Sequence, residues 1–262
     1  MKNKPIGIFD SGVGGTSIWK EINVMLPYEN TVYLADSKNA PYGGKSTEEI
    51  LGLSIKNTEL LLKMGSKLIV VACNTATTNA IAYLRKNYNV PFIGIEPAIK
   101  PAAIRSNSKK VGVLATKGTL SSDLFHETSK NYASGITILE REGIGLVPLI
   151  EEGKVNSEET KRLLHQFLQP MLDEEIDYLV LGCTHYPYLM PVLKELLPKH
   201  VKIIDSGEAV AKQTKAILAK NNLLNFSGKK ATHQFYSNTN TQVLETFLES
   251  ATQNMKVTYL DF

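Results

Sequence analysis

Hydrophobic residues recur along the chain in two patterns that alternate from one end to the other. Short apolar runs rich in Val, Ile and Leu predict buried strands, and the amphipathic stretches between them, such as Thr47–Met64 and Glu158–Glu174, predict helices. The predicted strands are Ile6–Asp10, Thr31–Ala35, Lys67–Cys73, Val90–Ile95, Val111–Ala115, Ile136–Glu140, Tyr178–Cys183, Val201–Asp205, Thr232–Tyr236 and Val257–Leu260. Fully apolar runs such as Leu68–Ala72 are typical of a parallel sheet that helices cover on both faces. The pattern therefore predicts an α/β fold.

Two pairs of these runs are similar in sequence. Ile6–Gly12 aligns with Val111–Lys117 at an offset of 105 residues. Leu68–Thr75 aligns with Tyr178–His185 at an offset of 110 residues. Because the two matches occur in the same order and each ends in polar residues, we expect two related α/β halves.

The repeat predicts two similar domains whose mainly parallel sheets face each other across a central cleft. The first domain is expected to comprise residues 1–98 together with 209–262, because the tail is too short to form a domain of its own. The second is expected to comprise residues 99–208. Pro97 and Pro101 flank the predicted crossover between them.

The composition is that of an ordinary globular protein, with 43% hydrophobic and 21% charged residues. The formal net charge of +3 is small and the basic residues are spread along the chain, so no nucleic-acid partner is expected. No apolar run reaches the roughly 18 residues of a membrane-spanning helix, and the N-terminus has no apolar segment typical of a signal peptide. We therefore expect a cytoplasmic protein without a membrane partner.

Polar residues cluster where four of the predicted strands end. The clusters are Asp10–Ser11, Cys73–Thr75, Thr116 with Thr119, and Cys183–His185. Ligands of parallel α/β sheets bind beyond the carboxyl ends of the strands. Helix N-caps explain any one cluster equally well, but four such clusters, with cysteines at equivalent places of the repeat, favour one ligand site.

Cys73 and Cys183 are the two cysteines of the chain. Each is expected at a helix N-terminus, where the helix dipole stabilises a thiolate and lowers the thiol pKa toward neutrality. If the two halves face each other, one thiol can take a proton from a carbon while the other delivers a proton to its opposite face. That arrangement inverts a stereocentre without a cofactor. For either cysteine alone, the alternative is a small buried hydrophobic residue.

Several other motifs indicate neither a nucleotide nor a metal. Gly12–Ser17 lacks the third glycine of a dinucleotide loop, and Gly44–Ser46 would end a P-loop whose first glycine is Asn39. Cys183 and His185 alone do not form a tetrahedral zinc site. The remaining histidines are expected at the surface: His126, His165, His200 and His233.

Six segments resemble, in the same order, the motifs of the glutamate racemases. They are Phe9–Gly15, Ala40–Gly43, Val71–Thr77, Ile95–Ala98, Leu114–Thr119 and Leu181–Pro187. The resemblance spans nearly the whole chain, and its two cysteine motifs are highly specific. It implies a homodimeric enzyme that needs no cofactor, interconverts L- and D-glutamate and supplies D-glutamate for peptidoglycan synthesis.

The resemblance also implies roles for individual residues. Cys73 would take the proton from D-glutamate with the help of Asp10, and Cys183 would take it from L-glutamate with the help of His185. Two further acidic residues match supporting positions of the family: Asp36 and Glu151, the latter with Glu152 as the alternative because the preceding Gly143–Leu146 departs from the family's pattern.

The residues that match substrate-holding positions flank these groups. Besides Asp10, Cys73, Cys183 and His185, they are Ser11, Pro41, Tyr42, Gly43, Asn74, Thr75, Thr116, Thr119 and Thr184.

Two other functions compete with this interpretation. An aspartate or hydantoin racemase would carry the same two thiols, although His185 and the full Asp10–Gly15 motif favour glutamate. A two-lobed module that binds an amino acid without turnover is the second alternative. The paired cysteines argue against it, since binding alone does not require them.

Overall fold

The computed structural model describes residues 1–132, 134–249 and 254–262, and within them it confirms the ten predicted strands. Their ends differ from the predicted ones by no more than two residues. The strands are β1 Ile6–Asp10, β2 Thr31–Ala35, β3 Leu68–Val71, β4 Phe92–Gly94, β5 Lys110–Ala115, β6 Thr137–Glu142, β7 Tyr178–Gly182, β8 Lys202–Ile204, β9 His233–Ser237 and β10 Met255–Tyr259.

Helices connect most of these strands. They are α1 Thr16–Met25, α2 Thr47–Lys63, α3 Asn74–Asn87, α4 Ile99–Arg105, α5 Lys117–Leu120, α6 Asp123–Tyr132, α7 Leu146–Glu151, α8 Glu158–Asp173, α9 Met190–Leu196, α10 Gly207–Lys220 and α11 Gln242–Leu248. Short 3₁₀ turns cover Ser37–Asn39, Tyr42–Gly44 and Tyr186–Leu189. The start of α2 is fixed by a capping box, in which Ser46 and Glu49 each accept the other's backbone N–H with their side chains.

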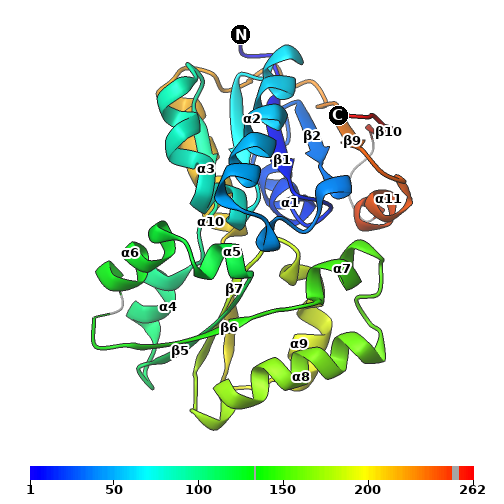
Figure 1. Ribbon diagram of the computed structural model, residues 1–262. Coiled ribbons are helices and arrows are strands. Elements are labelled where there is room, and N and C mark those ends of the chain that lie inside the picture. Colours follow the sequence, from blue (N-terminus) through cyan, green and yellow to red (C-terminus); the bar gives the residue numbers. More distant parts are fainter. Residues whose placement is uncertain (133, 250–253) are drawn as a thin grey trace.

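The strands form two parallel sheets, seen one above the other in Figure 1. The larger sheet has the order β10-β9-β2-β1-β3-β4 and the smaller one β6-β5-β7-β8. The repeat in the sequence is thus a repeat of topology, because β2-β1-β3-β4 and β6-β5-β7-β8 follow the same order. Even the register agrees: Ile6 pairs with Leu68, and their counterparts Val111 and Tyr178 pair with each other.

The strands of the larger sheet lie within residues 6–94 and 233–259, and those of the smaller sheet lie within 110–204. The helix α10, which follows the smaller sheet, packs against α1 beside the larger one. The predicted α/β class with two facing sheets is therefore confirmed. The domain boundaries at 98/99 and 208/209 stay a prediction.

The central strands are buried on both faces, which explains their unbroken apolar sequence. In β1, Ile8 packs into one hydrophobic cluster with Trp19, while the next residue, Phe9, packs into another with Ile50. All four side chains are almost fully buried. Because both faces of β1 are buried, the register of the strand in the sheet is fixed. The register in turn fixes the position of the carboxyl end, where the polar residues begin.

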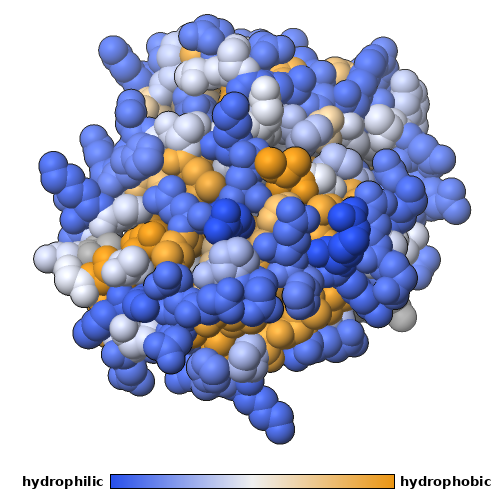
Figure 2. All heavy atoms as spheres, turned by 60° about the horizontal axis from the view of Figure 1, so that its bottom comes forward, coloured by the Kyte–Doolittle hydropathy of each residue, from blue (hydrophilic) through white to orange (hydrophobic). Residues whose placement is uncertain are grey.

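The surface is mixed in character. On the face turned forward in Figure 2, hydrophilic side chains predominate and hydrophobic ones gather in separate patches. Among the described residues, we find no helix with both the length and the apolar character needed to span a membrane.

One histidine departs from the predicted surface location. His126, His165 and His200 are exposed as expected, but His233 is only 4% exposed. The His233 ring lies edge-on against Trp19 of α1, with 5.2 Å between the ring centroids. This contact forms because β9, which begins with His233, pairs with β2 in the larger sheet.

Candidate active site

Loops at the carboxyl ends of β1, β3, β5 and β7 meet around one enclosed space of about 10 Å³. Both sheets contribute to its wall, as expected for ligand sites of parallel sheets. The lining residues are Ser11, Pro41, Tyr42, Gly43, Cys73, Asn74, Thr75, Thr116, Val147, Cys183, Thr184 and His185. Eleven of these twelve are residues that the sequence singled out. Of the other predicted residues, Asp10, Thr119, Asp36 and Glu151 lie behind this wall and contact its members.

Cys73 lies at the N-terminus of α3, where its sulfur accepts the backbone N–H of Ala76 at 3.5 Å. Its thiol donates to the Ser11 hydroxyl at 3.7 Å. The expectation of a lowered pKa is wrong for this thiol. Burial, and after it the negative charge of Asp10, raises the pKa of Cys73 above its usual range and outweighs the helix N–H.

Cys183 follows β7, and its sulfur lies 3.7 Å from Nδ1 of His185. The other ring nitrogen, Nε2, lies 2.6 Å from a carboxylate oxygen of Glu151. Burial lowers the pKa of His185, but the contacts with Cys183 and Glu151 raise it by more, so the pKa lies well above its ordinary value. The imidazole is therefore held between a carboxylate and a sulfur, two partners that favour its protonated form.

Asp10 lies at the end of β1, beneath the loop that opens α1. Its carboxylate accepts the backbone N–H of Gly12 at 3.2 Å and of Gly15 at 2.9 Å, and the Thr184 hydroxyl at 3.2 Å. Burial raises the pKa of Asp10 to about 6, against the lowering effect of the His185 charge. Asp10 thus titrates close to neutrality, as a group that relays protons does.

Three threonine hydroxyls form a triangle on one side of the space. Thr75 lies 2.8 Å from Thr116 and 3.4 Å from Thr119, and the latter two lie 3.1 Å apart. Beside them, both amide atoms of Asn74 are buried without a hydrogen-bond partner among the described residues. An unpaired buried amide is costly, so this side chain is poised to bind a polar ligand.

Asp36 is buried in a network one layer behind the wall. It accepts the hydroxyl of Tyr42 at 2.5 Å and the side-chain amide of Asn238 at 2.5 Å, and Lys56 lies 3.7 Å away. Asp36 thus contacts the enclosed space through Tyr42, which lines it. Asn238 ties the same carboxylate to the last residue, Phe262, whose carbonyl it also contacts.

The glycines of the loop before α1 allow two catalytic candidates to approach the backbone. A Cβ on Gly12 would lie 1.9 Å from an oxygen of Glu151, and one on Gly14 would lie 2.3 Å from Nδ1 of His185. The loop also holds Glu151, which accepts the Val13 N–H at 2.6 Å. The glycines of this loop, which resembles a dinucleotide motif, thus leave room for the side chains of Glu151 and His185 next to the backbone.

The two neighbouring acids have different partners in the structure. Glu151 contacts His185, while Glu152 pairs with Lys154 in an ion pair that is about half exposed. Residues that the sequence did not indicate also take part. Val147 lines the space from the apolar helix α7, and Ser37 donates to Glu151 at 2.9 Å. No local sequence pattern indicates Val147 or Ser37, because each reaches the site through contacts between segments that are distant in the chain.

A second hollow of about 170 Å³ adjoins the enclosed space. The two share Pro41, Gly43, Thr116 and Val147 in their walls. An amino acid needs more room than the enclosed space offers, so the wall between the two must move to admit one.

Comparison with known proteins agrees with this geometry. The family model described as Asp/Glu/Hydantoin racemase matches residues 23–214. A glutamate racemase from Herpetosiphon aurantiacus is 45% identical over 86% of this chain and 89% of its own length. A crystal structure of glutamate racemase from Escherichia coli, in complex with L-glutamate and the activator UDP-MurNAc-ala, has a TM-score of 0.85 at 32% identity, with 98% of each chain covered. The glutamate racemase from Francisella tularensis in complex with D-glutamate has a TM-score of 0.84 at 30% identity, again with 98% of each chain covered.

Proposed function

The chain belongs to the Asp/Glu/Hydantoin racemase family and, within it, to the glutamate racemases; from this we propose that it interconverts L- and D-glutamate by proton transfer between two opposed thiols, without a cofactor. One observation carries the proposal. Cys73 and Cys183 come from equivalent positions of two similar halves and line the same enclosed space. A binding module has no need of two such thiols.

The two thiols differ in the resting protein. The imidazole of His185, whose pKa is raised, lies next to the Cys183 sulfur. The raised pKa of Cys73 keeps that thiol protonated. Conversion of L-glutamate then starts from the state in which Cys73 is the acid and Cys183 is the base.

In this state the Cys183 thiolate takes the α-proton of L-glutamate, and the electron pair of the broken C–H bond stays on the α-carbon and its carboxylate. The Cys73 thiol then gives its proton to the opposite face. D-glutamate forms, Cys183 becomes the thiol and Cys73 the thiolate. The reverse reaction starts from that second state, and Asp10, with its pKa of about 6, relays protons at the Cys73 side.

The carbanion needs stabilisation, because an α-proton is far less acidic than a thiol. The unpaired amide of Asn74 and the hydroxyls of Ser11 and Thr184 offer hydrogen bonds to the substrate carboxylates. The threonine triangle of Thr75, Thr116 and Thr119 offers three more hydroxyls, and Pro41, Tyr42 and Gly43 close the wall. Exclusion of water strengthens each of these contacts.

The unequal thiols make a prediction for alkylation. At pH 7, iodoacetamide is expected to label Cys183 at least about ten times faster than Cys73, because only a thiolate reacts and burial raises the pKa of Cys73. Replacing His185 with asparagine removes the imidazole next to the Cys183 sulfur and should slow the labelling of Cys183. Peptide mass spectrometry of briefly treated protein measures both rates. Faster labelling of Cys73 would contradict the assigned resting state.

The glycine loop makes a second prediction. Gly14→Ala places a methyl group against the His185 ring, so kcat/KM should fall by about tenfold or more while the fold is kept. Gly52→Ala is the matched control, since its Cβ meets no atom within 4 Å in the middle of α2. It should leave kcat/KM unchanged and stabilise the protein by about 1 kcal/mol. Wild-type activity in Gly14→Ala would show that the loop does not position His185.

The activity itself is tested by polarimetry. A solution of L-glutamate should lose its optical rotation in the presence of the protein, and D-glutamate should do the same. Faster racemisation of L-aspartate or of a hydantoin would contradict the proposed substrate, and unchanged rotation of all three would favour the binding module.

The biological setting is part of the same proposal. We place the reaction in the cytoplasm, where free thiols such as Cys73 and Cys183 stay reduced, and assign its D-glutamate to peptidoglycan synthesis. The resemblance to the family further suggests a homodimer. Analytical ultracentrifugation tests the dimer, which should have twice the mass of the chain.

A further inference from the structure

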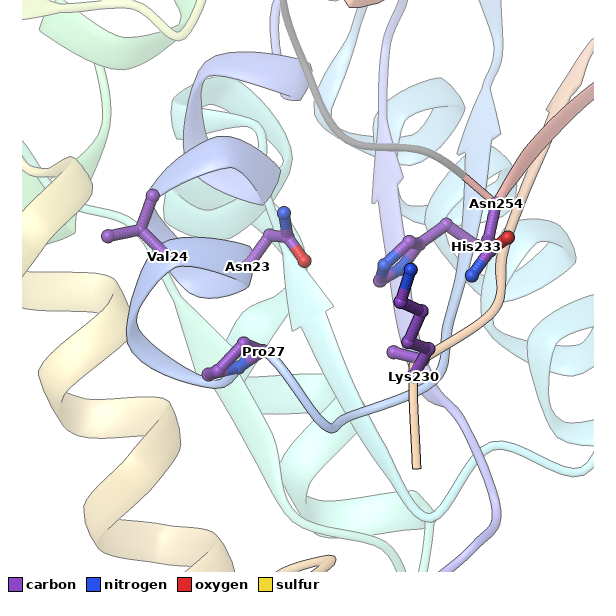
Figure 3. A pocket seen from close by; sticks show the side chains of 7 residues that line it. Asn23, Val24, Pro27, Lys230, His233 and Asn254 are labelled. Carbon is purple, nitrogen blue, oxygen red and sulfur yellow. The ribbon is translucent and has the colours of Figure 1, made fainter. Parts of the chain in front are cut away.

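A hollow of about 430 Å³ opens at the C-terminal end of α1 (Figure 3). The glycine loop of the active site lies at the other end of this helix, whose ten residues span about 15 Å. Its described walls come from α1 and the segment after it, from the residues that lead into β9 together with the first residue of that strand, and from the residue before β10. The lining residues are Asn23, Val24, Pro27, Lys230, Ala231, His233 and Asn254.

His233 lines this hollow and ends a hydrogen-bond chain that begins at Trp19. The indole N–H of Trp19 donates to the Thr31 hydroxyl at 2.9 Å, and that hydroxyl lies 2.9 Å from Nδ1 of His233. Burial lowers the pKa of His233 to about 4, so the ring is neutral at pH 7. The Thr31 hydroxyl has a proton of its own to donate to Nδ1, and in that arrangement the proton of the neutral ring is on Nε2. This nitrogen bonds to no atom of the described residues.

Lys230 and Asn23 bring further hydrogen-bond donors to the hollow. The Lys230 side chain extends toward the His233 ring, and the amide of Asn23 faces both from α1 (Figure 3). None of the described lining residues is acidic. The remaining wall is apolar and consists of Val24, Pro27 and Ala231. A buried imidazole N–H and an ammonium group next to an apolar wall match an anion that is attached to an apolar body.

We propose that this hollow is a second binding site, for a small carboxylate with an apolar body, whose carboxylate accepts from His233 Nε2–H and Lys230 Nζ while its apolar part lies against Val24 and Pro27. Such a ligand contacts the last turn of α1. The volume of the hollow accommodates a molecule the size of an aromatic acid.

Phenylacetate serves as the probe, and Trp19 serves as the reporter, since it is the only tryptophan of the chain and lies against His233. Titration with phenylacetate at pH 7 should change the tryptophan fluorescence in a saturable way. Lys230→Met removes the ammonium group and should raise the apparent Kd at least about tenfold. Lys229→Met is the matched control: Lys229 is exposed and does not line the hollow, so its Kd should equal that of the wild type.

The site would be overturned by the absence of a saturable signal, by equal affinity of the Lys230 and Lys229 variants, or by binding of the uncharged phenylacetamide as tightly as phenylacetate. Displacement of the probe by saturating L-glutamate would place it in the thiol cleft and would also overturn the site. The readout is binding and not turnover, so its failure is independent of a failure of the proposed racemase activity.

Discussion

Serine at position 73 or at position 183 is expected to abolish racemisation in both directions while the fold is kept. The substitution changes one buried atom, and the contacts of each sulfur with Ser11 or His185 are weak and long. A hydroxyl, however, has a pKa far above that of a thiol and cannot act as the base. We expect kcat to fall by at least about a thousandfold with either enantiomer. Measurement of kcat by circular dichroism with L- and with D-glutamate tests this.

Each serine variant keeps one competent thiol, which gives the experiment its internal control. A glutamate analogue with a leaving group at the β-carbon or on nitrogen needs only one proton abstraction to eliminate that group. Cys73→Ser should eliminate from the L-analogue, and Cys183→Ser from the D-analogue. If both variants prefer the same enantiomer, the two thiols do not act on opposite faces of the substrate.

The second large effect concerns the two groups behind the thiols. Asp10→Asn should slow proton transfer at Cys73, because it removes the carboxyl group that relays protons there. His185→Asn should slow proton transfer at Cys183, because it removes the imidazole next to that sulfur. Each effect is expected to be about ten- to a hundredfold. Since the enantiomers have equal free energies, kcat/KM stays equal in the two directions for every variant. The difference between the sides therefore has to be read from isotope effects.

Glutamate with deuterium at the α-carbon provides that measurement. In Asp10→Asn, abstraction from D-glutamate becomes rate-limiting, so the isotope effect on kcat/KM should be large with labelled D-glutamate and close to one with labelled L-glutamate. His185→Asn should show the reverse. Equal isotope effects with both enantiomers in both variants would contradict the assigned sides and leave the two-thiol mechanism standing.

The sequence predicts this fold well because the burial of each strand determines the composition of that strand's own residues. Each apolar run is buried on both faces by the helices next to it in the chain, so its composition alone identifies it. The repeat adds the topology, since Ile6 and Leu68 pair in the same register as Val111 and Tyr178. Polar residues at the strand ends then identify the site.

What the sequence does not predict depends on contacts between distant segments. The pKa of Cys73 is raised because both halves bury it, while the local pattern contains only the helix N-terminus that would lower it. Val147 lies on an apolar helix that looks like any core helix, and its place in the cavity wall is a matter of packing between loops. His233 is buried because β9, at the end of the chain, pairs with β2 near its beginning.

The glycine loop before α1 shows the same limit in another way. The spacing of Gly12 and Gly14 suggests a phosphate-binding loop with one glycine missing. In the structure these glycines leave room for Glu151 and His185, which come from more than a hundred residues away. A motif of small residues indicates a close approach, and only the fold shows what approaches.

Exchange of the α-hydrogen with solvent tests the central claim, that two thiols act on opposite faces of one carbon. The protein is incubated with L-glutamate in deuterium oxide, the reaction is stopped well before equilibrium, and the α-hydrogen of each enantiomer is measured by proton NMR after separation. With one thiol on each face, the D-glutamate formed carries deuterium at the α-carbon, while the remaining L-glutamate keeps its protium. Protium in the D-glutamate, or equal deuterium in both enantiomers, would mean that a single base serves both faces and would contradict the account.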